Sequence, residues 1–565
     1  MQNHKILNIL PPNRHLQDAL SKELGISRIL AQILANRGIK SKQEAKEFLK
    51  PELSDLLDPN SFSDMRKAVK LLRDAAKKKQ RVMIFGDYDA DGITGLALLK
   101  TTLKKMGLEA EHYLPHRVHD GYGLNKKILQ ICKEKRIDIL VSVDCGTNDH
   151  ELIRELRKSN VEVIITDHHE PSEPDKKSMA SAILNPKVKS CGYKFRDLAG
   201  VGVAYKLCQA LANDPLADDM DLVAIGTIAD IVPLVGENRI FAKEGLARIS
   251  QTRRLGLRAL MDVAGISGKK MSSRFVSFIL GPRINASGRI DTAETSLALL
   301  LADSEIEAKR LAQIVHSQNR DRQKIERGIL EEAQDIIDRE VNFKDHKVIV
   351  IAKENWHQGV LGIVASKLAD RFYRPTIVLS LTDDLCKGSG RSIKSFHLLD
   401  ALLHCKDQLH TFGGHSHAAG LVLKRDNIDN FRLSINRLAH DKLRIEDLLP
   451  SLEVDMELPL AQLGEAEIIE FEALEPFGRG NPNPKFYSRG LKVKGEAAVL
   501  SRDTLKFWVT ESGITYPAIG FGMSSSKQSV EEADSIDLVY SPRIDTWQGE
   551  DSIILEIEEI FLNRA

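Results

Sequence analysis

Val82-Met83-Ile84-Phe85-Gly86-Asp87-Tyr88-Asp89-Ala90-Asp91-Gly92 joins an apolar run to three alternating carboxylates. The apolar part is typical of a buried β-strand, and the acids stand at its carboxyl end. In extended backbone, residues two apart project from the same side, so we expect Asp87, Asp89 and Asp91 to converge on one point. Carboxylates held so close repel one another unless cations lie between them. The segment therefore predicts a site for divalent metal.

An EF-hand loop also begins with alternating acids before a glycine. Its twelfth position should be a bidentate glutamate, but Leu98 stands there, and the preceding run predicts a strand where an EF-hand needs a helix. This excludes an EF-hand. A polar turn with solvated acids is the simplest alternative for the segment taken alone.

Further candidate ligands follow later strands. From about residue 80 to 235, short apolar strands alternate with amphipathic helices, which indicates βαβ units around a parallel sheet. Ligands bind beyond the carboxyl ends of the strands in such sheets. Asp144 follows one apolar run, and the sequence Asp167-His168-His169 follows the next. Adjacent side chains diverge, so we expect one histidine to bind metal while the other faces substrate or a supporting partner.

One more acid completes the predicted centre. Asp230 lies in an otherwise apolar helical stretch, where an unpaired carboxylate would be costly to bury. Together these residues supply about six ligands, enough for two ions with one bridging carboxylate. Such centres hydrolyse phosphate esters, and no fingerprint of a redox cofactor accompanies the ligands.

Composition limits the class of protein. A chain of 565 residues with 42% hydrophobic and 28% charged residues predicts several folded domains. No apolar run is long enough for a membrane span, and we expect a cytoplasmic protein. The six cysteines form no C-x-x-C pair, which argues against disulfides and structural zinc.

Charge gives no global signal for nucleic acid, because Lys and Arg total 80 and Asp and Glu total 80. Local patches must carry any such role. The segment from Arg66 to Arg81 is strongly basic, and a solvated helix face is an equally good interpretation of it.

The rest of the chain predicts further elements. Residues 237–302 are expected to be mainly helical, and a long helix is expected from Asp303 to about Arg339, with Ser304 and Glu307 at capping-box spacing. Its middle, residues 316–324, is polar on all sides, which favours a bridge across solvent between domains. A second α/β unit follows, with two expected glycine-rich loops at 388–392 and 413–420. Beyond about 450, short strands suggest a small barrel or sandwich.

The motifs around the acids resemble those of the DHH phosphoesterase superfamily. They are Asp89-Ala90-Asp91-Gly92, Val143-Asp144-Cys145-Gly146 and Asp167-His168-His169. Within that superfamily the chain is similar to the RecJ exonucleases over nearly its whole length. The similarity includes the stretches 121–125, 200–207, 230–234, 283–289 and 357–363, and the loop 413–420 resembles the signature of a DHHA1 domain.

The resemblance implies an α/β fold. A parallel-sheet DHH domain would be joined by a long helix to a smaller α/β DHHA1 domain, with an OB-like β-barrel at the C-terminus. The expected division of the chain is an N-terminal helical segment 1–60, the DHH domain 61–236, a helical region 237–302, the connecting helix 303–340, the DHHA1 domain 341–445 and the OB-like domain 446–565.

The same resemblance assigns roles to residues. The expected ligands of two Mn²⁺ or Mg²⁺ ions are Asp87, Asp89, Asp91, Asp144, His168 and Asp230. His169 is expected near the substrate phosphate and joins the catalytic set. Asp87 is either a direct ligand or a residue that orients a neighbour.

RecJ-like enzymes degrade single-stranded DNA from its 5′ end, which implies a pocket for a terminal phosphate. The candidate phosphate-binding or DNA-binding residues are Arg117, Arg289, Ser389, Arg391, His415 and His417. For Arg391 an ordinary surface position is the alternative, and for the loop 413–420 a glycine turn without ligand. In the barrel, Phe507 and Trp508 cannot both face one side of a strand, so at least one is expected in the core.

The function expected from this resemblance is 5′-to-3′ exonucleolytic hydrolysis of single-stranded DNA to 5′-mononucleotides, in DNA repair and recombination. The alternatives are a DHH phosphodiesterase that acts on short oligonucleotides or cyclic dinucleotides, a pyrophosphatase, and a non-catalytic DNA-binding scaffold. By family resemblance alone, the partners would be a single-strand-binding protein and a RecQ-type helicase, and the protein would be a monomer.

Overall fold

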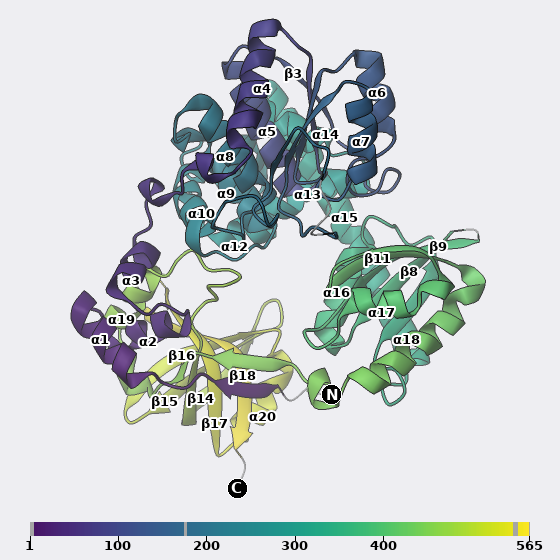
Figure 1. The fold of residues 1–565 in the computed structure, drawn as a ribbon. Helices are drawn as coiled ribbons and strands as arrows, with labels where there is room; N and C mark the ends of the chain where they lie inside the picture. The colour runs from purple at the N-terminus through teal and green to yellow at the C-terminus, as the bar shows by residue number, and fades with distance from the viewer. Residues whose placement is uncertain (1–4, 174–177, 383, 546–551, 564–565) are drawn as a thin grey trace. The chain divides into compact units, whose positions relative to one another are not determined.

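The computed structural model describes residues 5–173, 178–382, 384–545 and 552–563, which fall into two compact units (Figure 1). The described residues of the first unit lie within 58–230 and 245–450. Those of the second lie within 5–57, 231–244 and 451–563. The second unit is therefore assembled from three separate stretches of chain.

The first unit contains a five-stranded parallel sheet in the order β3-β2-β4-β5-β6. Its strands are β2 (Val82–Gly86), β3 (Ala110–Tyr113), β4 (Ile139–Val143), β5 (Glu162–Thr166) and β6 (Ala182–Leu184). Every residue of β2 and β4 is buried, which explains why these strands are apolar throughout instead of alternating. The predicted parallel sheet is confirmed.

Helices cover both faces of this sheet (Figure 1). On one side lie α6 (Lys127–Lys135) and α7 (His150–Lys158), whose apolar residues share a core with β2, β4 and β5. On the other side lie α4 (Met65–Lys78), α5 (Ala90–Lys105), α8 (Gly200–Ala212) and α9 (Met220–Ala229).

The region that follows is mainly helical, as predicted. It contains α10 (Gly236–Ile249), α11 (Leu255–Val263), α12 (Ser273–Phe275), a π-helical segment (Val276–Leu280), α13 (Gly281–Ile290) and α14 (Glu294–Leu301). None of the helices in the described part of the chain has the length and apolar character that a membrane crossing requires.

The long helix α15 runs from Glu305 to Glu340, and the Ser304 hydroxyl accepts a hydrogen bond from the Glu307 amide as its N-cap. The predicted polar middle is exposed at Ser317, Arg320, Asp321, Gln323 and Lys324, but one side of it is not solvated. Asn319, Arg322 and Glu326 are buried there, because Arg322 donates to Asn319 at 2.7 Å and pairs with Glu326. Mutual pairing lets polar side chains occupy a helix face that packs against protein.

A second, mixed sheet has the order β10-β11-β9-β8-β7. Its elements are β7 (Ile349–Glu354), α16 (Leu361–Phe372), β8 (Thr376–Thr382), β9 (Leu385–Arg391), α17 (Leu398–His404), β10 (Leu409–Gly414), β11 (Ala418–Lys424) and α18 (Ile428–Lys442).

Both glycine-rich loops expected in this sheet are wrong. Residues 388–391 belong to the central strand β9, and most of 413–420 belongs to the hairpin β10–β11. A Cβ on Gly388 would lie 2.4 Å from a side-chain carbon of Leu379. Glycine is needed in this strand for close packing, which the sequence pattern does not distinguish from a loop.

In the second unit, β14 (Phe486–Leu500), β15 (Thr504–Glu511), β16 (Ile514–Phe521), β18 (Ser552–Asn563) and β17 (Ser535–Asp545) form a closed barrel, because β14 also pairs with β17. Helix α20 (Lys527–Glu531) precedes β17, and β13 (Met456–Glu457) pairs with β14. Phe507 is buried and Trp508 is exposed, which confirms that the two rings face opposite sides of β15. The predicted barrel is confirmed.

The N-terminal segment packs with this barrel. Its elements are β1 (Ile6–Ile9), α1 (Arg14–Leu24), α2 (Arg28–Asn36) and α3 (Lys42–Leu49), and β1 pairs in parallel with β12 (Ser451–Val454). Apolar residues of α2 share one core with the barrel and with α19 (Glu465–Glu472). Neither strand β1 nor this long-range packing is indicated by a local pattern in the sequence.

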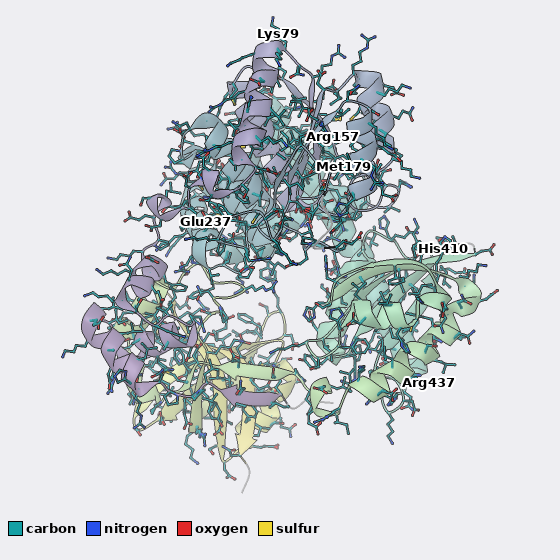
Figure 2. The ribbon with its side chains drawn as sticks, viewed as in Figure 1. Lys79, Arg157, Met179, Glu237, His410 and Arg437 are labelled. Carbon is teal, nitrogen blue, oxygen red and sulfur yellow. The ribbon has the colours of Figure 1, made fainter. Side chains whose placement is uncertain are left out.

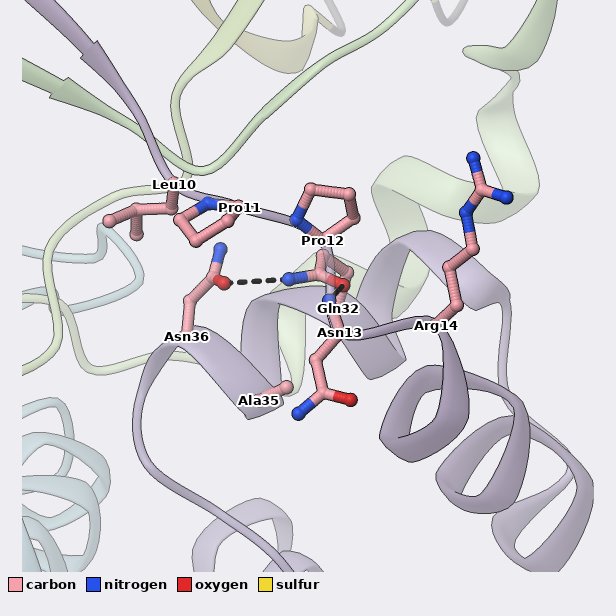
Figure 3. Close-up of a pocket in the computed structure, with 8 residues that line it drawn as sticks. All are labelled: Leu10, Pro11, Pro12, Asn13, Arg14, Gln32, Ala35 and Asn36. Carbon is pink, nitrogen blue, oxygen red and sulfur yellow. Dashed lines mark hydrogen bonds between the residues drawn. The ribbon is translucent and has the colours of Figure 1, made fainter.

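A pocket in the second unit is lined by Leu10–Arg14, Gln32, Ala35 and Asn36 (Figure 3). Gln32 accepts from the Asn13 amide and donates to the Asn36 side chain at 2.8 Å. Asn36 in turn donates to Asp455. These amides are already paired within the protein, so the pocket presents no feature that selects a ligand.

Candidate metal centre and arginine cluster

The turn from β2 into α5 positions the first three acids. Asp87 follows the strand, and Asp89 is the N-cap of α5, where its carboxylate accepts hydrogen bonds from the amides of Asp91 and Gly92 at 3.0 and 3.2 Å. Asp91 lies in the first helical turn and is buried. The expected convergence of all three on one point is wrong because the chain turns into a helix at Ala90: Asp87 and Asp89 belong to one group of possible ligands and Asp91 to another.

The other predicted ligands come from three further elements. Asp144 follows β4 with a φ of 63°, His168 follows β5, and Asp230 is the residue after α9. The Nε2 atom of His168 lies 3.2 Å from Asp144 Oδ1, 3.6 Å from Asp230 Oδ2 and 3.9 Å from Asp91 Oδ2. One imidazole nitrogen therefore faces three carboxylates.

Three groups of side chains bring ligand atoms within 4.8 Å of one another. They are Asp87, Asp89 and Asp144; Asp91, His168 and Asp230; and Asp144, His168 and His169. All seven residues of the predicted metal and catalytic sets occur in these groups. We call Asp87, Asp89, Asp91, Asp144, His168 and Asp230 the carboxylate centre.

The electrostatics of the carboxylate centre favour bound cations. Burial, and then the charge of Asp89, raises the pKa of Asp87 to about 8 and that of Asp91 to about 7. Burial and neighbouring carboxylates also raise the pKa of Asp144 and of Asp230 well above the ordinary value. Like charges packed out of water account for these shifts, and a divalent cation would reverse them.

The donor set suits Mn²⁺ or Mg²⁺. Burial lowers the pKa of His168 to about 3, so its imidazole is neutral and can act as a ligand. Buried oxygens of Asp87 and Asp144 and the Nε2 atom of His168 make no hydrogen bond among the described residues. Buried polar atoms are ordinarily paired, so these unpaired atoms, which converge on one space, fit the role of metal ligands.

His169 is held by partners that are not metal ligands in any of the three groups. Its Nδ1 atom lies 2.8 Å from Asp167 Oδ1 and 2.8 Å from the Tyr122 hydroxyl, which also donates to the Asp144 carbonyl. Burial by itself lowers the pKa of His169, but the hydrogen bond with Asp167 and the charges of Asp167, Asp87 and Asp89 together outweigh that effect, and the net shift is upward. Asp167 and Tyr122 therefore orient this ring beside the centre.

Backbone amides support the centre as well. The amides of Gly200 and Val201, at the start of α8, donate to the Asp91 carboxylate at 2.6 and 2.7 Å. A Cβ on Gly200 would lie 2.6 Å from Asp144 atoms, so only glycine allows this approach. Asn285 of α13 accepts from the Ala90 amide at 2.8 Å. These supports lie in stretches that carry the family resemblance, which was the signal available for finding them.

Three of the predicted phosphate-binding residues form an arginine cluster, which we define as Arg117, Arg289 and Arg391. Burial and then the charge of Arg117 lower the pKa of Arg289 to about 9 and lower that of Arg391. Arg117 lies over the Tyr88 ring at 4.1 Å. The charge of Arg117 lowers the pKa of Asp87, and the charge of Asp89 raises the pKa of Arg289. The arginine cluster therefore borders the carboxylate centre.

Contacts from the second sheet fix the cluster. Arg289 donates to the Gly359 carbonyl at 3.2 Å. Arg391, at the end of β9, donates to the Ser389 hydroxyl at 3.3 Å and to the Gly390 carbonyl at 2.8 Å. Arg391 is largely buried, so it is not an ordinary surface arginine. Guanidiniums gathered in this way favour an anion among them.

The two predicted histidines of the hairpin differ in position. Both side chains are exposed, but the His415 ring lies nearly parallel to the His169 ring at a centroid distance of 6.3 Å, whereas the His417 carbonyl accepts a hydrogen bond from the Ser392 amide. Lys187 was not predicted, yet its charge acts on His168, Asp230 and His415. Its position in a loop after β6 left no pattern by which sequence reasoning could single it out.

Comparison with protein families gives three matches along the chain. Residues 81–227 match the DHH family N-terminal domain, 345–441 match the DHHA1 domain and 454–559 match the RecJ OB domain. The three matches agree with the parallel sheet, the mixed sheet and the closed barrel.

Similar proteins cover nearly the whole chain. The single-stranded-DNA-specific exonuclease RecJ of Bacillus subtilis is 35% identical over 95% of this chain and 68% of its own length. The Escherichia coli protein of the same name is 33% identical over 94% of this chain and 96% of its own length.

Solved structures agree with these relatives. RecJ of Thermus thermophilus in complex with Mn²⁺ matches 100% of this chain and 81% of its own, with 28% identity and a TM-score of 0.86. A RecJ exonuclease bound to manganese matches 69% of this chain and 100% of its own, with 34% identity and a TM-score of 0.60.

Proposed function

The chain belongs to the RecJ family of single-stranded-DNA-specific exonucleases, and we propose that it hydrolyses single-stranded DNA from the 5′ end at a two-metal centre. It is a metal-dependent nuclease by family membership. The observation that carries the proposed site is the convergence of Asp87, Asp89, Asp91, Asp144, His168 and Asp230 on one space, with Asp144 common to two groups of possible ligands.

In this proposal Asp144 would be a ligand of both ions, with Asp87 and Asp89 as the other ligands of one and Asp91, His168 and Asp230 as those of the other. When bound, the ions supply a nucleophilic water at neutral pH and neutralise charge on the phosphoryl oxygens. The amides at the start of α8 each donate to one oxygen of the Asp91 carboxylate, so the orientation of that carboxylate is fixed before substrate arrives. Asp87 is a direct ligand in this assignment.

His169 acts on the substrate side. Asp167 and Tyr122 fix its ring, and His415 stacks on it from the hairpin β10–β11. We assign His169 to the scissile phosphate, where a positioned imidazole N–H can donate a hydrogen bond to a phosphoryl oxygen. His415 is assigned to the same stretch of DNA, and His417 is a more peripheral contact.

The arginine cluster gives the enzyme its end preference. A 5′-terminal phosphate carries about −1.5 to −2 charges, whereas an internal phosphodiester carries about −1. Arg117, Arg289 and Arg391, with the Ser389 hydroxyl, match the more highly charged group. A terminal phosphate held there, beside the carboxylate centre, positions the first phosphodiester bond for cleavage and releases a 5′-mononucleotide.

The test is digestion of single-stranded and double-stranded DNA, labelled at the 5′ or the 3′ end, with Mn²⁺, Mg²⁺ or EDTA. We expect 5′-mononucleotides from the 5′-labelled single strand with metal, no products with EDTA and little cleavage of the duplex. Labelled mononucleotides released first from the 3′ end would contradict the direction. Cleavage that persists in EDTA would contradict the metal centre.

The family resemblance also motivates proposals about the location, the oligomeric state and the partners of this protein. We propose a cytoplasmic monomer that acts in DNA repair and recombination beside a single-strand-binding protein and a RecQ-type helicase. Sedimentation equilibrium tests the monomer, and binding of the purified protein to each purified partner tests the associations. A stable dimer or absence of binding would contradict the corresponding proposal.

A further inference from the structure

Helix α4 carries a row of cations on the side that faces away from the core. Met65, Ala68, Leu72 and Ala75 are its buried residues. On the opposite side, exposed cations recur at intervals of four, three and four residues, namely Arg66, Lys70, Arg73 and Lys77. At about 1.5 Å per residue the row is about 16 Å long. Lys79, which follows the helix, lies at the outer tip of this domain in Figure 2.

Among the described residues, the cations of this row are not paired with acidic side chains, as the cations of an ordinary solvated helix often are. On α15, Lys309 pairs with Glu305 and Arg310 pairs with Glu307. In the described part of the chain, no ion pair is recorded for the row's Arg66, Lys70 and Lys77. Arg73 instead donates to the last carbonyls of α8. The row therefore keeps a net positive field.

Asp64 and Asp74 are the acids at this helix. Asp64, the N-cap, is engaged by the Ile183 amide at 2.9 Å, and Asp74 stands between Lys70 and Lys77 in the sequence. Two acids against the many cations of α4 leave the face basic.

A basic loop connects this face to the carboxylate centre. At the start of α4, Ser63 donates to the carbonyls of Cys191 and Ser190 at 2.7 and 2.9 Å. The loop that these contacts hold exposes Lys194 and Arg196. Arg196 donates to the Lys187 carbonyl at 2.9 Å, and the charge of Lys187 acts on Asp230 and His168.

We propose that the α4 row, defined as Arg66, Lys70, Arg73 and Lys77, together with Lys194 and Arg196, is a second DNA-binding surface that contacts backbone phosphates of the substrate away from the scissile bond. This inference rests on the proposed function. Helix α4 contains no aromatic residue, so it offers cations for phosphates and no ring for stacking bases. The surface therefore binds without sequence preference and adds affinity for longer substrates.

The test compares two triple variants of the full chain in EDTA, where binding is measured without cleavage. One is Arg66→Gln, Lys70→Gln, Lys77→Gln on α4. The matched control is Arg437→Gln, Lys442→Gln, Arg444→Gln at the end of α18 and just beyond it, which removes the same charge from exposed positions (Figure 2 labels Arg437). Fluorescence anisotropy with labelled single strands gives the affinity as a function of salt concentration.

We expect the α4 variant to bind a strand of about 30 nucleotides on the order of tenfold more weakly than the wild type, with a salt slope smaller by about 2, because each lost phosphate contact changes the slope by about 0.7. For a strand of about 6 nucleotides, which cannot reach beyond the centre, we expect a loss of less than about twofold. The control variant should match the wild type with both strands.

Equal affinity of the α4 variant and the wild type for the long strand would overturn the proposal and would leave an acidic protein segment as the occupant of this face. Equal losses in both triple variants would also overturn it, because the effect would then be one of net charge. The proposed function is judged separately, by whether the wild-type protein cleaves the same strands with Mn²⁺.

Discussion

The carboxylate centre and the arginine cluster both hold several charges of one sign, and they respond to this in opposite ways. Burial raises the pKa of Asp87 to about 8 and of Asp91 to about 7, so these carboxyl groups can take up protons near neutral pH. Burial lowers the pKa of Arg289 only to about 9, so that guanidinium keeps its charge. The centre can relieve its repulsion by protonation, whereas the cluster requires an anion.

The two regions also differ in how the chain builds them. The acids follow strands of one sheet or lie in adjoining helices, and backbone amides brace them. The arginines come from three distant stretches, and Arg289 and Arg391 donate to backbone carbonyls of the turn before α16 and of β9. Loss of an acid should therefore stop the chemistry, whereas loss of an arginine should mainly weaken substrate binding.

The largest expected effect is at the shared ligand. Asp144→Asn should lower the cleavage rate by roughly 10³-fold or more, because a neutral amide cannot hold two cations. Asparagine tolerates the φ of 63° at this position, so the variant should fold. Nuclease assays with Mn²⁺ measure the rate, and thermal unfolding in EDTA measures the fold. Activity within tenfold of the wild type would remove Asp144 from the centre.

In the arginine cluster, the substitution that corresponds to Asp144→Asn is Arg391→Gln. We expect a loss of about tenfold to a hundredfold in the preference for a 5′-phosphorylated over a 5′-hydroxyl strand, because a charge-assisted hydrogen bond to phosphate is worth about 1.5–3 kcal/mol. The effect should fall on KM more than on kcat. Arg437→Gln, on the exposed face of α18, is the control. An unchanged end preference would count against the cluster as the phosphate site.

Metal removal should make stability depend on pH. The carboxyl groups of Asp87 and Asp91 have a higher pKa in the folded than in the unfolded protein, so their contribution to stability is present below about pH 4 and is lost as pH rises through about 7 to 8. In EDTA we expect Tm to fall by a few degrees between about pH 5.5 and 8.5.

Adding Mn²⁺ or sulfate tests the carboxylate centre and the arginine cluster separately. Added Mn²⁺ should raise Tm more at the upper than at the lower pH, because protons and metal compete for the same oxygens. Added sulfate, which stays dianionic, should stabilise the arginine cluster to a similar extent throughout, because Arg289 does not titrate in this range. A Tm in EDTA that rises with pH would contradict the raised pKa values.

The smallest expected difference separates the two histidines of the hairpin β10–β11. His415→Ala removes a ring that stacks on His169, and we expect a loss of about threefold to tenfold in kcat/KM. His417→Ala should change kcat/KM by less than about twofold, because in the described part of the chain the ring that stacks with His169 is that of His415 and not that of His417. Assays on one labelled single strand compare them. Equal losses would show that the stacking contact is not what matters.

Much of the site could be predicted because its residues carry local signals. The acids stand next to apolar strands, and parallel strands bring their carboxyl ends to one edge of a sheet. The same reasoning gave the wrong geometry for Asp89 and Asp91, since it could not distinguish a continuing strand from a helix N-terminus. It also missed Lys187, which lies in a loop without periodicity.

Other elements could not be predicted because neighbours distant in the sequence decide them. Glycines at 388 and 390 suggest a loop, yet packing against Leu379 and Leu398 makes them part of a central strand. The polar middle of α15 suggests a helix solvated on all sides, yet the pairing of Arg322 with Glu326 allows one side of it to be buried. The polarity of a segment does not predict its exposure where a partner side chain pairs with its polar groups.

By itself, the sequence determined the kind of chemistry: acids and imidazoles at strand ends specify divalent metal, and the alternation of strands and helices specifies the sheet that gathers them. Only the tertiary structure decided that Asp144 is common to two ligand groups, that Arg117, Arg289 and Arg391 form one cluster, and that residues 5–57 pack with the C-terminal barrel. The physical reason is that periodicity records the burial of each segment, whereas the choice of partner depends on shape and charge across segments hundreds of residues apart.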